Sequence, residues 1–138
     1  MEFSTNFSSI NLLVMFGASV AANLVGALWY SPFLFGKAWR ADAGLSERAD
    51  SADNPVGTFI SAFVLQFVAA CMIGGLLGHN AGFTEGSRLG ALVGFALVFT
   101  AVGMINLFED RPKRLVFIHG GYHITALCIM GAIIGQWN

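Results

Sequence analysis

The sequence predicts an all-α membrane protein with four transmembrane helices in an antiparallel up-down bundle. Apolar residues make up 56% of the chain and charged residues 11%, whereas a soluble domain carries about 25% charged residues. Each span must supply the ~20 apolar residues that a helix needs to cross a ~30 Å hydrocarbon core. Four stretches without Asp, Glu, Lys or Arg reach this length, at 3–36, 54–84, 89–108 and 115–138.

These stretches place helices at about 9–30, 56–78, 85–108 and 113–137, within one integral membrane domain over 1–138. The short polar turns between the last three helices make consecutive helices antiparallel neighbours. Thr84 and Asp110 precede helices three and four, and their side-chain oxygens suit the N-cap position.

The first helix is predicted to end at a membrane boundary. Trp29 and Tyr30 follow its apolar residues, and Ser31-Pro32 comes next, before the first basic residues. Aromatic residues at the end of an apolar helix, followed by a helix-ending proline and then basic residues, are typical of a chain that leaves a bilayer. Ser31 is expected to cap a short interfacial helix at about 33–43, with Trp39 turned inward; an irregular aromatic loop is the alternative.

The distribution of basic residues predicts the orientation. Only Arg88 lies on the side of both termini and the 79–88 turn. Because Lys and Arg are enriched in cytoplasmic loops, we expect loops 32–56 and 109–114 inside and both termini outside, in a multi-pass protein of the bacterial inner membrane. The six basic residues of those loops are Lys37, Arg40, Arg48, Arg111, Lys113 and Arg114.

Several function classes find no support in the sequence. The net charge is −1 and there is no basic tract, so a nucleic-acid partner is not expected. No nucleophile–base pair or paired carboxylates can be recognised, so we expect no enzyme, no catalytic residue and no cofactor. Cys71 and Cys128 fall in the middle of different helices and are interpreted as small packing residues.

Every helix carries small residues at four-residue spacing, which lets membrane helices approach closely. Such ridges serve the interior of a bundle, an interface between copies, or both. With so many ridges in a short chain, we expect a homo-oligomer. The ridges are Ala18, Ala22 and Gly26; Ala70, Gly74 and Gly78; Gly86, Gly90 and Gly94; and Gly131 and Gly135.

A set of polar residues within the spans forms the candidate ligand-binding site. An unpaired polar group in hydrocarbon costs about 1–3 kcal/mol or more, so these side chains should converge between helices. At 1.5 Å per residue they fall in the cytoplasmic half or near the midplane. We therefore predict one polar cluster, covered by Trp29 and the 31–40 segment. Its members are Asn23, Tyr30, Gln66, Asn106, His119, Tyr122 and His123.

Three interpretations of this cluster remain open. The first is that the polar groups only satisfy one another and fix helix packing in a structural or accessory protein. The second is a cytoplasm-facing pocket that binds or passes a small solute, an ion or a proton. The third, a metal site, has only His119 and His123 as weak candidates, whose i, i+4 spacing suits zinc. A third ligand would have to come from Glu109, Cys71 or Cys128, and nothing in the spacing demands any of them.

The chain also resembles a known family. The segment 29–39 reads WYSPFLFGKAW, and further matching pieces are 106–109, Gly121-Tyr122, Met130-Gly131 and Trp137. These pieces are similar to a bacterial family of small four-helix integral membrane proteins, the domain-of-unknown-function family seventeen sixty-one. The resemblance implies a membrane architecture over most of the chain. It implies no activity, substrate or cofactor.

Overall fold

The computed structural model describes residues 6–45 and 55–138, and within this part the chain is helical and has no strand. Four of the described helical stretches are long and apolar enough to cross a membrane: α1 (Leu12–Trp29), α3 (Pro55–Leu77), the stretch Phe83–Phe108 and α6 (Lys113–Trp137). The prediction of an all-α protein with four spans is confirmed.

Shorter elements complete the described chain. The third span consists of α4 (Phe83–Val93), the π-helical segment η2 (Gly94–Phe99) and α5 (Thr100–Phe108). A 3-10 turn, η1 (Phe7–Ser9), precedes α1, and α2 (Gly36–Asp42) follows it.

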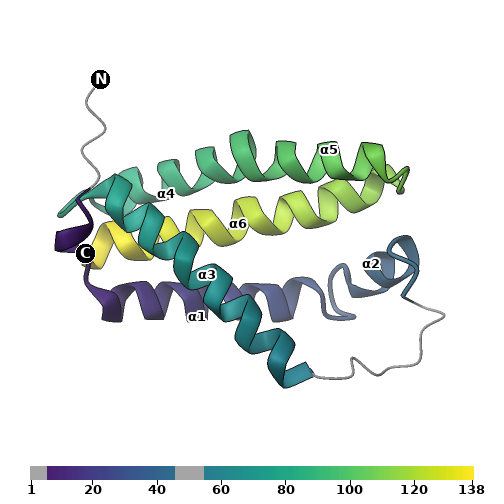
Figure 1. Cartoon of the computed structure of the whole chain (residues 1–138), viewed down its shortest axis with the longest axis horizontal. Coiled ribbons are helices and arrows are strands. Elements are labelled where there is room, and N and C mark those ends of the chain that lie inside the picture. The colour runs from purple at the N-terminus through teal and green to yellow at the C-terminus, as the bar shows by residue number, and fades with distance from the viewer. Residues whose placement is uncertain (1–5, 46–54) are drawn as a thin grey trace.

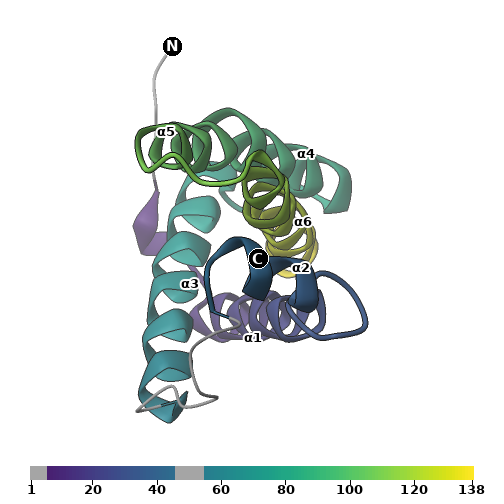
Figure 2. The ribbon, with the colours of Figure 1, turned by 90° about the vertical axis from the view of Figure 1, so that its right-hand side faces the viewer.

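Helix α6 is the centre of the molecule. In Figure 1, α1, α6 and the α4–α5 stretch lie side by side, and α3 crosses α1 obliquely. Figure 2 shows α6 between the α4–α5 stretch and α1, with α3 to one side. In its most apolar 18-residue window, α6 buries 50% of its residues, whereas the third span buries 11%. Most of the third span therefore faces outward, and α6 supplies most of the core.

Glycines bring α4 and α6 into backbone contact. Gly86, Gly90 and Gly94 lie against the backbone of α6 near Gly131, Leu127 and Ile124, so the contacts run in opposite sequence order. A Cβ atom on Gly90 would collide with the Leu127 carbonyl. Such close approach maximises van der Waals contact, which drives helix association in lipid.

The small residues of α1 and α3 are also used within the chain. Met15 is fully buried and its side chain fills the space over Gly74. Ala18, Ala22 and Ala70 are fully buried too. These residues pack inside one chain, so they no longer argue for an interface between copies. The homo-oligomer stays a prediction.

The predicted caps of the third and fourth spans were wrong. Thr84 lies inside α4, whose N-cap is Gly82 with φ +89°. Asp110 takes a left-handed conformation, φ +52°, in the turn before α6, and Pro112 stands at the N-cap. Thr84 is the second residue of α4 and Asp110 lies two residues before the N-cap of α6, so neither stands at the position from which a side chain caps the following helix.

The two ends of α1 also differ from the prediction. The helix starts at Leu12 rather than residue 9, because the Asn11 side chain accepts the N–H groups of Leu13 and Val14. At the other end the Ser31 hydroxyl donates to the Leu28 carbonyl at 2.6 Å. Ser31 therefore closes α1 instead of capping α2. The predicted interfacial helix is present, but it starts only at Gly36.

Candidate functional site

A cavity of about 730 Å³ lies between α1, α3, η2 and α6. One wall is polar and carries side chains from three helices, while the rest is apolar. Trp39 of α2 contributes to the lining from the end of the molecule at which α1 terminates. The polar lining residues are Asn23, Tyr30, Thr58, Gln66, Tyr122 and His123, and the large apolar ones are Phe59, Leu65, Val98 and Leu127.

Tyr122 ties three helices together at this wall. Gln66 Nε2 of α3 donates to Tyr122 Oη at 2.6 Å, and Tyr122 Oη donates to the Ala22 carbonyl of α1 at 3.1 Å. Gly26 makes room for the ring, since a Cβ atom there would lie 3.1 Å from Tyr122 Oη. The Gly26 position therefore fixes the depth at which the tyrosine enters the bundle.

Tyr30 is held by a second polar contact. Its hydroxyl shares a hydrogen bond of 2.6 Å with Nδ1 of His119. Its ring lies edge-on to Trp39 and to Tyr122, with centroid distances of 4.9 and 5.5 Å. His119 thus positions an aromatic wall of the cavity without lining the cavity itself.

Three lining residues have polar atoms that make no hydrogen bond within the described part of the chain. Asn23 Nδ2 donates to the Ser19 carbonyl at 3.0 Å, which leaves its Oδ1 unused. Gln66 uses its nitrogen, and its Oε1 is unused. His123 makes a ring contact with Tyr122 and no hydrogen bond. None of these atoms is fully buried, since the described residues contain no buried unpaired side-chain N or O.

The structure brings most of the predicted cluster together. Asn23, Tyr30, Gln66, Tyr122 and His123 all line the cavity. Two members stand elsewhere, His119 behind Tyr30 and Asn106 at the turn between α5 and α6.

The cover of the cavity differs from the prediction in one residue. Trp39 of the predicted 31–40 segment lines the cavity. Trp29 does not line the cavity; its Nε1 donates to the Ile118 carbonyl of α6 at 2.9 Å and its ring packs over Gly121.

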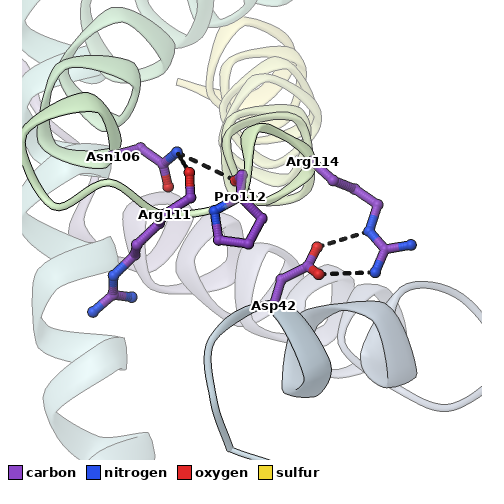
Figure 3. A network of polar contacts seen from close by, with 5 residues as sticks. All are labelled: Asp42, Asn106, Arg111, Pro112 and Arg114. Carbon is purple, nitrogen blue, oxygen red and sulfur yellow. Dashed lines mark hydrogen bonds and ion pairs between the residues drawn. The ribbon is translucent and has the colours of Figure 1, made fainter.

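Asn106 is a structural residue of the α5–α6 turn (Figure 3). Its side chain is 6% exposed. Its Nδ2 donates to the carbonyls of Arg111 and Pro112, at 3.0 and 3.2 Å. Both amide hydrogens are therefore used to close the turn, which explains why a buried asparagine stands there.

An ion pair fastens α2 to α6 (Figure 3). Nε and Nη2 of Arg114 lie 2.7 and 2.9 Å from the two carboxylate oxygens of Asp42. The Asp42 side chain is 11% exposed, and the hydrogen bonds from the Arg114 guanidinium hold the pKa of this carboxyl below its usual range. The pair is therefore charged at neutral pH. It keeps α2, and Trp39 with it, at the end of the cavity.

The histidines do not form a metal centre with the other candidate ligands. Within residues 6–45 and 55–138, no three or more His, Cys, Asp and Glu side chains are grouped so that they could hold a metal. His119 Nδ1 is engaged by Tyr30. Cys71 and Cys128 are free thiols.

The apolar part of the lining was not predicted. Phe59, Leu65 and Val98 look like any lipid-facing residue, so no signal in the sequence separates them from the rest of their helices. Trp39 did carry a signal, because it was expected to turn inward from an interfacial helix.

The chain was compared with known proteins. A family model described as "Protein of unknown function (DUF1761)" matches residues 13–135. Neither curated proteins nor solved structures give a significant match. The matched range starts one residue inside the first span and ends two residues before the end of the fourth, and it includes every residue that lines the cavity.

Proposed function

The chain belongs to the DUF1761 family of proteins of unknown function, and we propose that it is a multi-pass membrane protein whose cavity binds a small uncharged polar ligand. The observation that carries this proposal is the convergence of Asn23, Gln66 and His123 on one cavity, each with a polar atom that makes no hydrogen bond within residues 6–45 and 55–138. A ligand that hydrogen-bonds these atoms would offset their desolvation.

The charge of the lining favours an uncharged ligand over an ion. Among the described residues that line the cavity, none is Asp, Glu, Lys or Arg. An ion moved into such a site would lose its hydration without a compensating charge, which costs several kcal/mol. Amides and a neutral imidazole can replace the water that surrounds a neutral polar molecule.

A purely structural role accounts for only part of the cluster. The bonds of Gln66, Tyr122 and Tyr30 join helices and are worth about 0.6 kcal/mol each in a membrane protein. His123 makes no hydrogen bond within the described residues, so interhelical bonding does not explain it. We propose binding rather than catalysis, because the described lining residues include no carboxylate or thiol, and no interaction pairs a lining hydroxyl with His123 as a nucleophile with its base.

Filling the cavity tests this proposal. Wild-type protein, gently extracted in detergent, is expected to retain a bound small molecule in native mass spectrometry. Ala62→Trp places an indole among the lining residues and should abolish that adduct by excluding the ligand sterically. The matched control is Leu24→Trp, on a position of α1 that is 65% exposed, which should keep the adduct. A wild-type protein without adduct, or an Ala62→Trp variant that keeps it, would favour the structural role.

We further propose the bacterial inner membrane as the location, with both termini outside. Support comes from four basic residues of α2, the α5–α6 turn and the start of α6, namely Lys37, Arg111, Lys113 and Arg114. These elements lie at the end of the molecule opposite the start of α1 and the end of α6 (Figure 1); Arg48 lies outside the described residues. Lys and Arg are retained on the cytoplasmic side.

Single cysteines test this orientation in a background with Cys71→Ser and Cys128→Ser. A membrane-impermeant maleimide applied to spheroplasts should label Asn138→Cys at the C-terminus and leave Lys113→Cys unlabelled. Labelling of Lys113→Cys, with Asn138→Cys protected, would reverse the orientation.

A further inference from the structure

The mouth of the cavity opens at the depth of the lipid chains. Leu65 lines the cavity and yet is 71% exposed. It is ten residues after the start of α3 at Pro55, which places it roughly 15 Å along the span, near the bilayer midplane. Phe59, nearer the start of the same helix, lines the cavity and is 63% exposed. A ligand can therefore reach the cavity from the hydrocarbon without passing through water.

The oblique course of α3 explains this opening. The helix crosses α1 at an angle (Figure 1), and in the end-on view it stands apart from α6 near its start (Figure 2). Nearer its other end α3 packs on α1, where the Met15 side chain lies over Gly74. The cavity fills the space that this divergence leaves beside Gln66.

Aromatic rings form the wall beside the polar atoms. The ring of Tyr30 lies edge-on to the rings of Trp39 and Tyr122, and all three line the cavity. Planar rings favour stacked or edge-on contact with other planar rings. A flat, conjugated head group therefore suits this wall.

The free hydrogen-bonding groups suit a ring that carries oxygen atoms. The amide nitrogens of Asn23 and Gln66 each use one N–H in the protein, and each amide has a second N–H. The amide oxygens and the His123 ring add acceptors and a further donor. Such a mixed set can bond the carbonyl oxygens of a quinone and equally the hydroxyls of its reduced form.

We propose that the small uncharged polar group bound in the cavity is the ring of an isoprenoid quinone or quinol, which enters sideways from the bilayer, with this ring beside Asn23, Gln66 and His123 and its apolar tail leaving past Leu65. This rests on the proposed function of the cavity. Only binding is inferred. The absence of charged residues from the described lining argues against a phospholipid head group in the same place.

Quinone binding can be measured directly. Protein in phosphatidylcholine nanodiscs is titrated with decylubiquinone, and Trp39, in the cavity lining, reports by fluorescence quenching. Trp29→Phe and Trp137→Phe remove the other indoles. We expect a saturable component on top of the linear quenching from quinone dissolved in the lipid. His123→Leu and Gln66→Leu should each weaken it about tenfold or more, because each removes a hydrogen-bonding group.

Two controls make the result decisive. Leu24→Ala, on the lipid-facing side of α1, should leave the saturable component unchanged. Gln66 also donates to Tyr122, the residue that ties three helices together, so His123→Leu is the variant that decides if Gln66→Leu does not fold. Linear quenching alone in the wild type would overturn the quinone assignment. If the wild type then still carries an adduct that Ala62→Trp removes, the proposed function stands; if it carries none, both proposals fail.

Discussion

Gly90→Val is expected to separate α4 from α6 and to destabilise the protein by about 3 kcal/mol or more. Gly90 faces the backbone of α6 at Leu127 and Cys128, and a Cβ atom there would overlap a carbonyl oxygen. Backbone atoms of a packed helix cannot rotate aside as a side chain can, so the helices must move apart. Thermal unfolding in detergent, followed by circular dichroism, measures the loss.

Gly17→Val is the matched control for this substitution. Gly17 lies within α1, and a Cβ atom there would meet nothing within 4 Å. Its unfolding temperature should stay close to that of the wild type. Equal decreases in unfolding temperature in the two variants would mean that valine acts through its lower helix propensity. The close α4–α6 contact would then not be the reason for a glycine at position 90.

Asn106→Asp is expected to destabilise the protein by about 1–3 kcal/mol. The substitution keeps the shape of the side chain and replaces the donor of two hydrogen bonds with an acceptor. That oxygen would face the carbonyls of Arg111 and Pro112, 3.0 and 3.2 Å from the present nitrogen. The site is 6% exposed, so water cannot easily replace the lost bonds. Denaturation in a mild detergent, titrated with sodium dodecyl sulfate, measures the change.

Asn80→Asp provides the comparison for Asn106→Asp. Asn80 is exposed, with φ +56° in the turn before α4, a conformation that Asp also tolerates. It should unfold within about 0.5 kcal/mol of the wild type. A loss at Asn106 no larger than the loss at Asn80 would show that the turn does not depend on the amide.

Much of the candidate site could be predicted because buried polar residues need partners. Asn23, Gln66 and Tyr122 were expected to lie together because exposing any of these polar side chains to lipid costs free energy. In the structure they lie together at one wall of the cavity. The same argument placed Asn106 with them. It did not distinguish a side-chain partner from a main-chain one, and Asn106 satisfies its amide on the carbonyls of its own turn.

The ends of the helices were less predictable than the spans. Ser31, Thr84 and Asp110 are all residue types that cap helices, and none of them caps the following helix. A cap depends on the backbone angles of one residue. Those angles are set by where the next helix must pack, which a local pattern does not contain.

The sequence by itself determined that this chain has four membrane spans and which polar residues must be shielded from lipid. Span length and the absence of charge are local properties, because each segment must by itself be long and apolar enough to cross the hydrocarbon core. Only the tertiary structure decided that α4 and α6 touch through their glycines, that α3 crosses obliquely, and that a cavity beside Gln66 stays open. Leu65 at the mouth of the cavity and Leu24 on the lipid side are equally apolar, so hydrophobicity cannot separate them. That distinction comes from packing alone.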